Sequence, residues 1–191
     1  MSKKQLIVCL LVLSLIPCSA FIAKVIYAEE QQQVDWDKIE KALYEELKAT
    51  SDKSDAEIHQ AIGYSLLRSE NQWERATVHF KKAVGLDPKL YFSWYNLGMI
   101  NADTEEGYNY FKKATEAKPD FPSSYYWMAY YRCRNREDKK AIPLFQKYIE
   151  VAKGDKQEAG RIGVAEEVLQ DLLAGKEGKS LSMMRRPSEG E

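Results

Sequence analysis

The chain has 191 residues, enough for one ordinary domain with a leader and a tail to spare. Apolar residues make up 45% of it and charged residues 30%, a balance typical of globular proteins and not of disordered ones. The net charge of −1 gives no general reason to expect a nucleic-acid partner, which usually needs a clustered basic face.

Residues 1–28 have the pattern of a signal for export. Two lysines precede an apolar run at 6–16, and Pro17 ends this run just before a group of small residues. The pattern predicts cleavage after Ala20 or after Ala28.

An uncleaved anchor is the competing interpretation of the same segment. The apolar stretch at 6–23 has about the 18 residues that can span a bilayer, so it could attach the protein to a membrane. In both versions the domain is exported, and we expect it in the periplasm, anchored to the membrane facing the periplasm, or secreted. Cys9 and Cys18 lie in this leader, so Cys133 has no intramolecular disulfide partner once the leader is removed.

A helix is expected at 35–50. Trp36, Ile39, Leu43 and Leu47 recur at helical spacing and form one apolar stripe. The opposite face is rich in Glu and Lys, which suits a terminal helix that covers one open end of a stack of helices.

Three similar segments follow, at 56–90, 91–121 and 122–153. Their central aromatic residues stand 31 and then 34 residues apart: Phe80, Phe111 and Phe145. The second segment carries the clearest motif, Trp94-Tyr95-Asn96-Leu97-Gly98. A period near 34, with W-x2-L-G and later A-x3-F and P, is the signature of the tetratricopeptide repeat. The chain therefore resembles the tetratricopeptide-repeat family.

The resemblance implies an all-α fold of three helix–turn–helix repeats, stacked as a short superhelix between two capping helices. Gly63 is expected to let the two helices of the first repeat approach closely. The second repeat is three residues shorter than the usual repeat, and the deficit falls at the turn formed by 102–104. Gly107 replaces the usual alanine, so its hairpin must be tight. In the third repeat Met128-Ala129 replaces Leu-Gly, and Arg132 falls where a large apolar residue is expected.

The second helix of the first repeat is expected to start at Asn71, a good N-cap residue. We expect it to run to Val84 and to turn four residues inward: Trp73, Ala76, Phe80 and Ala83.

A second capping helix is expected at 155–174. Asp155, with Glu158 three residues later, resembles a capping-box start, and Gly175 suits the position after the last turn. From Lys176 onward the composition turns to Gly, Ser, Lys, Arg and Glu, which predicts a disordered tail at 176–191.

The sequence holds no motif for catalysis, a cofactor or a metal. His59 and His79 stand twenty residues apart without metal-ligand spacing, so we assign them structural or surface roles. Cys133 has no base partner nearby in sequence, and a small buried thiol is the default for such a residue. We therefore predict no enzyme, no catalytic residue, no cofactor and no metal ligand.

A binding role has more support. In the family, the first helix of each repeat lines a concave groove, and the repeat register then implies these groove residues: Tyr64, Arg68, Phe92, Tyr95, Asn96, Met99, Tyr126, Tyr130 and Arg134. Tyr and Arg dominate binding hot spots. An aromatic groove edged by Arg68 and Arg134 suits an extended peptide with an acidic residue or a terminal carboxylate. The alternative is packing, because a register error would place Tyr126 and Tyr130 in the core.

The family's clamp for the C-termini of heat-shock chaperones is not matched here. Its places hold Gln60, Tyr64, Asn96, Ser123 and Trp127, and only Asn96 agrees. We predict an exported, non-catalytic adaptor that binds a peptide or protein segment in the cell envelope. The alternatives are self-assembly into homo-oligomers and a role as an accessory structural subunit of an envelope complex.

Overall fold

The computed structural model describes residues 35–69 and 72–185. It divides into two units, 1–39 and 40–191, and the features below belong to the second, apart from the first residues of α3 at 36–39. The leader predicted at 1–28 and the cap predicted at Asn71 lie outside the described residues.

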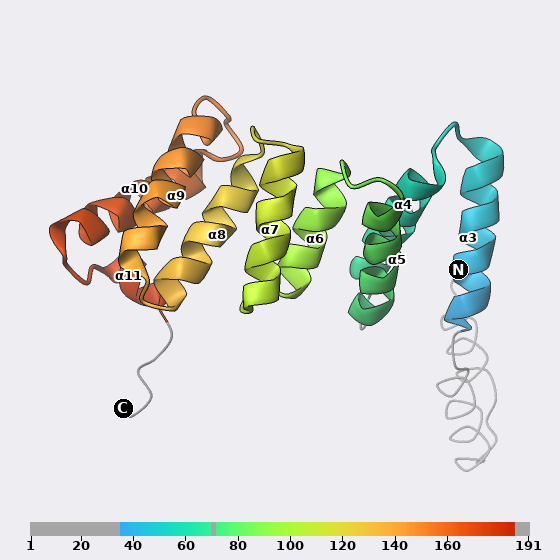
Figure 1. Cartoon of the computed structure of the whole chain (residues 1–191), viewed down its shortest axis with the longest axis horizontal. Coiled ribbons are helices and arrows are strands. Elements are labelled where there is room, and N and C mark those ends of the chain that lie inside the picture. The colour runs from blue at the N-terminus through green and yellow to red at the C-terminus, as the bar shows by residue number, and fades with distance from the viewer. Residues whose placement is uncertain (1–34, 70–71, 186–191) are drawn as a thin grey trace, which may run out of the picture. The chain divides into compact units, whose positions relative to one another are not determined.

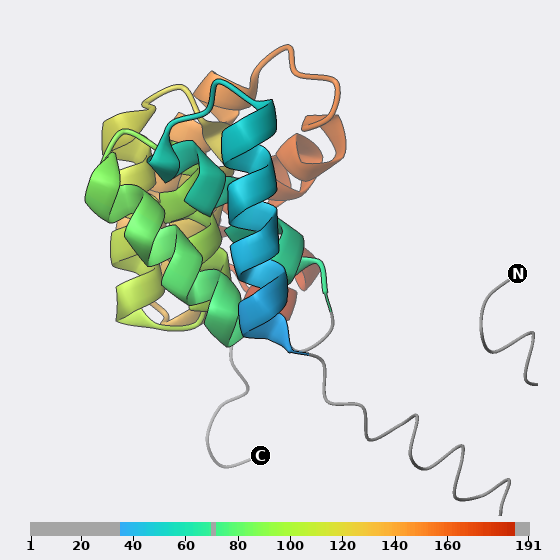
Figure 2. The ribbon, with the colours of Figure 1, turned by 90° about the vertical axis from the view of Figure 1, so that its right-hand side faces the viewer.

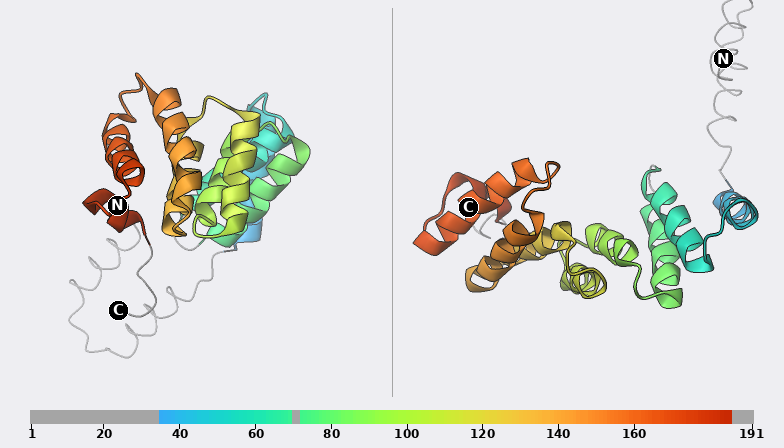
Figure 3. Two further views of the ribbon diagram at one scale, coloured as in Figure 1. Left: turned by 60° about the vertical axis from the view of Figure 1, so that its left-hand side comes forward. Right: turned by 90° about the horizontal axis from the view of Figure 1, so that it is seen from above.

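The described residues form helices and no strand (Figure 1). The helices are α3 (Trp36–Thr50), α4 (Asp55–Leu67), α5 (Trp73–Leu86), α6 (Tyr91–Ile100), α7 (Glu105–Ala117), α8 (Pro122–Arg134), α9 (Asp138–Ala152), α10 (Ala159–Ala174) and α11 (Lys179–Met184). Three antiparallel hairpins, α4–α5, α6–α7 and α8–α9, follow one another in chain order (Figure 3), and α10 packs on α9. Figure 2 shows the helices of successive hairpins one behind another. The predicted all-α, tetratricopeptide-like helical repeat is confirmed.

Local sequence sets several helix ends. The Ser54 hydroxyl accepts a hydrogen bond from Glu57 N, and the Glu57 carboxylate accepts one from Ser54 N, so α4 starts with a capping box. Thr104 caps α7 by accepting a hydrogen bond from Gly107 N. Gly175 ends α10 in the left-handed conformation (φ 62°), as its position predicted.

The hairpins close through glycines that face aromatic rings. A Cβ on Gly63 would lie 3.0 Å from the Phe80 ring, and one on Gly98 would lie 2.6 Å from the Phe111 ring. Both rings are fully buried. The close approach predicted for Gly63 is therefore confirmed, and the same arrangement recurs in the second hairpin.

Arg132 stands at the place where the repeat pattern predicted a large apolar residue, and its side chain is 13% exposed. Its guanidinium carbon lies 3.9 Å from the centroid of the Tyr108 ring, and its Nη1 pairs with Glu137 at 2.5 Å. Stacking on the ring and the ion pair compensate the charge, so an arginine fills the apolar position.

Two sequence predictions are wrong in this part of the chain. Trp73 was expected to face inward, but it is 58% exposed at the start of α5. The tail was expected to be disordered from 176, but α11 occupies part of it. Leu181 and Met184 of α11 are buried in the core that α8, α9 and α10 share. An apolar pair only three residues apart gives no periodic signal, so composition alone was misleading here.

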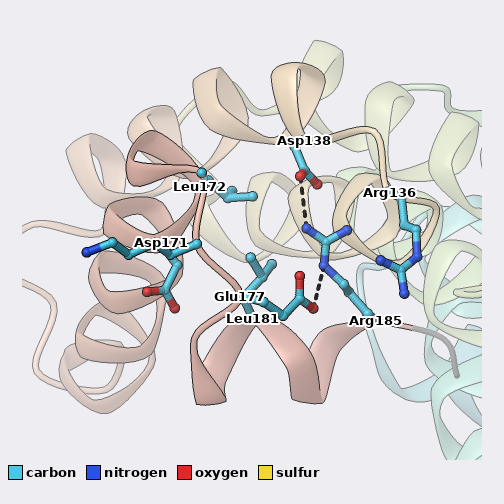
Figure 4. A pocket seen from close by; sticks show the side chains of 9 residues that line it. Arg136, Asp138, Asp171, Leu172, Glu177, Leu181 and Arg185 are labelled. Atoms are coloured by element: carbon cyan, nitrogen blue, oxygen red, sulfur yellow. Dashed lines mark hydrogen bonds and ion pairs between the residues drawn. The ribbon is translucent and has the colours of Figure 1, made fainter. Parts of the chain in front are cut away.

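An ion-pair cluster fixes the end of α11. The Arg185 side chain is 7% exposed and pairs with Asp138 at 2.8 Å and with Glu177 at 2.9 Å. Figure 4 shows these two pairs beside a cavity of about 380 Å³ between α10, α11 and the start of α9. Because the buried guanidinium of Arg185 has both carboxylates as partners within the domain, we assign this cluster a structural role.

Cys133 should react slowly with thiol reagents in the folded protein. It is fully buried in the same core as Leu181, and burial raises the pKa of its thiol to about 12. The reactive thiolate therefore stays scarce between about pH 7 and 9, where an exposed thiol becomes reactive. We expect Leu181→Asp to undock α11 and to speed labelling of Cys133 by Ellman's reagent, measured in a Cys9→Ser/Cys18→Ser background.

Ser182→Asp is the matched control, because Ser182 is exposed on the same helix. Fast labelling of the unaltered protein would show that α11 does not cover Cys133. Circular dichroism should show that the helices other than α11 are retained in all three proteins, so that the rates can be compared.

Candidate functional site

Aromatic side chains from the first helices of the three hairpins are linked by a chain of ring contacts that passes through the core at Phe111 of α7. The ring of Tyr64 lies 5.6 Å from Phe92, Phe92 lies 6.3 Å from Tyr95, and both distances join centroids. The buried ring of Phe111 connects Tyr95, at 5.8 Å, to Trp127, at 6.4 Å. We call the surface residues the aromatic row: Tyr64, Phe92, Tyr95, Tyr126, Trp127 and Tyr130.

The row combines accessible and packed rings. Tyr64 is 40% exposed, and the other members are half-buried. Tyr126 also packs against Tyr148, with centroids 5.2 Å apart, and against Phe145. Burial raises the pKa of both Tyr95 and Tyr126. Tyr126 thus has a packing role, as the alternative interpretation of the sequence foresaw, while the Tyr64 ring remains accessible.

Two arginines edge the row, but they differ in their partners. Arg68 is exposed and donates to the Tyr64 hydroxyl at 3.4 Å, one helical turn before it. Arg134 donates in the same way to the Tyr130 hydroxyl at 3.2 Å, but its Nε also pairs with Asp103 at 3.0 Å. Arg68 is therefore the cation that a carboxylate could reach with the least competition.

The remaining predicted groove residues, Met99 and Asn96, lie in different environments. Met99 lines a cavity of about 430 Å³ together with Trp127 and Tyr130. Asn96 is only 4% exposed, and its amide nitrogen donates to the Phe92 carbonyl at 2.7 Å. The amide is used inside α6, so we correct the prediction and remove Asn96 from the groove.

The sequence missed a buried carboxylate beside the row. Glu158 is 8% exposed and accepts hydrogen bonds from the hydroxyls of Tyr148, at 2.8 Å, and Ser123, at 3.2 Å. Arg161 of α10 pairs with Glu158 at 2.8 Å, and its guanidinium lies 5.3 Å from the Tyr126 ring centroid. Glu158 was expected to belong to a capping box with Asp155. Instead α10 starts at Ala159 without a side-chain cap, because the carboxylate turns inward.

The two histidines, which seemed unrelated in sequence, touch each other. His59 Nδ1 lies 3.0 Å from His79 Nδ1, and His79 Nε2 lies 3.1 Å from the Glu40 carboxylate, which also pairs with Arg75. The Tyr44 ring lies 5.5 Å from His59. Burial, and next the neighbouring His79, lower the pKa of His59. The group links α3 to the first hairpin, a structural role.

In residues 35–69 and 72–185, no three His, Cys, Asp or Glu side chains gather closely enough to hold a metal ion. In the same residues, no helix has both the length and the apolar character needed to cross a membrane. The anchor expected at 6–23 lies outside the described residues.

Comparison with known proteins gives a likeness in fold. No protein-family model matches the chain, and no curated protein matches it. Among solved structures, the crystal structure of MamA, a protein with tetratricopeptide repeats, is similar with a TM-score of 0.54 and 21% identity. The match covers 88% of this chain and 96% of that one. At this identity the likeness shows the fold alone, and the fold is a tetratricopeptide-like helical repeat similar to that of MamA.

Proposed function

We propose that this protein is a non-catalytic adaptor that binds an extended peptide or protein segment along the aromatic row. The observation that carries the proposal is the chain of ring contacts that runs from α4 and α6, through the buried Phe111 of α7, to α8. The aromatic row thus draws on all three repeats, and Tyr64 and Arg68 stand accessible at one end. A fold of this type usually serves as a scaffold for protein interactions.

The row has the physical properties of a binding surface. Its rings are held by neighbouring rings, so a ligand that covers them costs little side-chain entropy. Tyrosine and tryptophan bring large contact area with a polar end. Tyr126 and Tyr95 anchor the row in the core, and Tyr64 and Tyr130 are the members that carry an arginine beside the hydroxyl.

The charges around the row favour an acidic residue at one place in the ligand. Arg134 and Arg161 each have a carboxylate partner, Asp103 and Glu158. Arg68 is exposed, and its guanidinium lies 5.8 Å from the Tyr64 centroid. We therefore expect a carboxylate of the ligand beside Arg68, with an apolar or aromatic residue next to it on the Tyr64 ring.

We also propose that the adaptor acts outside the cytoplasm. The support is the pattern of residues 1–28, a positive start, an apolar run and a small-residue site. An adaptor of this kind would meet its partner in the cell envelope.

The test is capture from an envelope extract with the wild-type protein and a Tyr64→Ala/Arg68→Glu variant, followed by binding of the captured protein's segments as synthetic peptides. Both side chains are exposed, so the variant should fold normally. We expect the variant to bind at least about tenfold more weakly, because it loses an aromatic contact and reverses a charge.

Lys112→Glu, an exposed charge reversal on α7, is the matched control and should keep full binding. Equal binding by wild type and the Tyr64/Arg68 variant would exclude the aromatic row as the site. Recovery of a second copy of this chain as the main partner would replace the adaptor with self-assembly.

A further inference from the structure

The second hairpin has a short first helix. Its first helix, α6, has 10 residues, whereas α4 and α8 have 13 each. At 1.5 Å per residue, α6 is shorter by about 4.5 Å. The turn at 101–104 follows it and leads into α7.

A cavity lies on each side of this short turn. One, of about 300 Å³, is lined by Trp73 and Thr77 of α5 with Ile100 and Asn101. The other, of about 430 Å³, is lined by Ala102, Trp127 and Tyr130, and also by Ile100 and Asn101. Because the two cavities share Ile100 and Asn101, they flank one turn. We call this region the turn notch: Trp73, Thr77, Ile100, Ala102, Trp127 and Tyr130.

Trp73 is the most exposed aromatic ring of the notch. The repeat pattern places Trp73 on the inward side of α5, but it is 58% exposed. The start of α5 and the α6–α7 turn lie at the same edge of the array, at the bottom of Figure 1. Trp73 is thus an exposed ring that lines a cavity, and tryptophan is enriched in binding hot spots.

The charges of the notch select the partner. Three carboxylates stand at the cavities, on Glu74, Asp103 and Glu106. Two of these carboxylates have a cation as a partner: Asp103 pairs with Arg134 at 3.0 Å, and Glu106 lies 3.9 Å from Lys81. Carboxylates thus outnumber cations among the residues that line the two cavities, and Glu74 is exposed next to Trp73.

We propose that the turn notch is a second docking surface, which takes a protein segment carrying a bulky apolar side chain beside a lysine or arginine. The apolar side chain of the partner enters between Ile100 and a tryptophan of the notch, Trp73 or Trp127. The lysine or arginine of the partner pairs with the Glu74 carboxylate. Cavities of this size lie in the range that ligands fill. This surface goes beyond the groove function: Trp127 and Tyr130 belong to both surfaces, but Trp73 and Ala102 belong only to the notch.

The test uses a phage-displayed library of random dodecapeptides as the probe. The library is first depleted on a Trp73→Ala/Ala102→Arg variant of the full chain and then selected on the wild-type protein. We expect the enriched peptides to share a large apolar residue next to Lys or Arg. As a fluorescent synthetic peptide, the consensus should bind Trp73→Ala and Ala102→Arg at least about tenfold more weakly than wild type.

Leu86→Ala is the matched control, since Leu86 is 60% exposed at the other end of α5. It should leave binding unchanged, and circular dichroism should show equal helicity in all variants. The proposal that the notch is a docking surface would be overturned by any of three results: no enriched peptides, an acidic consensus, or binding that is unchanged by Trp73→Ala. Peptides lost with Tyr64→Ala but kept with Trp73→Ala would also overturn it, while supporting the aromatic row.

Discussion

Gly107→Ala is expected to destabilise the protein by about 3 kcal/mol, near the upper end of the cost of inserting a methyl group into a packed site. A Cβ at this position would lie 2.0 Å from the carbonyl oxygen of Asn101 and 2.6 Å from its carbonyl carbon. Both are backbone atoms, so no side chain can rotate away. The α6–α7 turn itself must move, and the melting temperature should fall by roughly 6–12 °C.

Gly85→Ala is the matched control, because it makes the same chemical change in a helix. Gly85 is exposed in α5, and nothing lies within 4 Å of a Cβ built there. Alanine should stabilise the helix by about 0.5–1 kcal/mol, since it lowers the entropy of the unfolded chain. Urea denaturation followed by circular dichroism compares the two variants. A Gly107→Ala protein as stable as wild type would show that the hairpin is looser than the structure indicates.

The fold could be predicted from the sequence because its determinants are local and repeated. The glycine at 63 reports a close helix contact, and the Phe residues mark the period. The shortening of the second repeat at the turn 102–104 and the glycine at 107 indicated a tight hairpin. The short α6 and the close approach of Gly107 to Asn101 both agree with that prediction. These features depend on spacing along the chain, which a sequence displays directly.

The candidate site was only partly predictable, because spacing gives the face of a helix and not the partner of a side chain. The register placed Tyr64, Phe92, Tyr95 and Met99 on one surface, where the structure brings their helices together. It could not show that Asn96 donates to its own helix. Nor could it show that Arg134 has Asp103 as a partner, since Asp103 lies in the turn of another hairpin.

Residues far apart in sequence account for the other differences. Arg185, at the end of α11, donates a hydrogen bond to Asp138, forty-seven residues earlier. This contact helps to fold a segment whose polar composition predicted disorder. The inward turn of Glu158 likewise requires Ser123, thirty-five residues before it. A local motif such as Asp155-x-x-Glu158 competes with such contacts, and the buried hydrogen bonds prevail because an unsatisfied hydroxyl in the core is costly.

Glu158→Ala is expected to destabilise the protein by about 3 kcal/mol. The change leaves the hydroxyls of Tyr148 and Ser123 without their acceptor and Arg161 without its carboxylate. Breaking a buried ion pair costs about 3–5 kcal/mol, and we take the lower end because Arg161 is 40% exposed. Denaturant unfolding measures the loss. A double-mutant cycle with Tyr148→Phe should give a coupling of about 1 kcal/mol, as hydrogen-bonded neighbours do.

The Glu158→Gln variant distinguishes two interpretations of Glu158: membership of the buried network, and the capping box that the sequence favours. Glutamine serves a capping box as well as glutamate, so that interpretation predicts almost no loss for Glu158→Gln and about 1 kcal/mol for Asp155→Ala. In the network, glutamine keeps an acceptor for Tyr148 but loses the charge opposite Arg161, so Glu158→Gln should cost about 1–2 kcal/mol. Asp155→Ala should then cost less, because its carboxylate accepts only the Gln157 amide at the surface. The reverse order of the two losses would restore the capping box and remove Glu158 from the core.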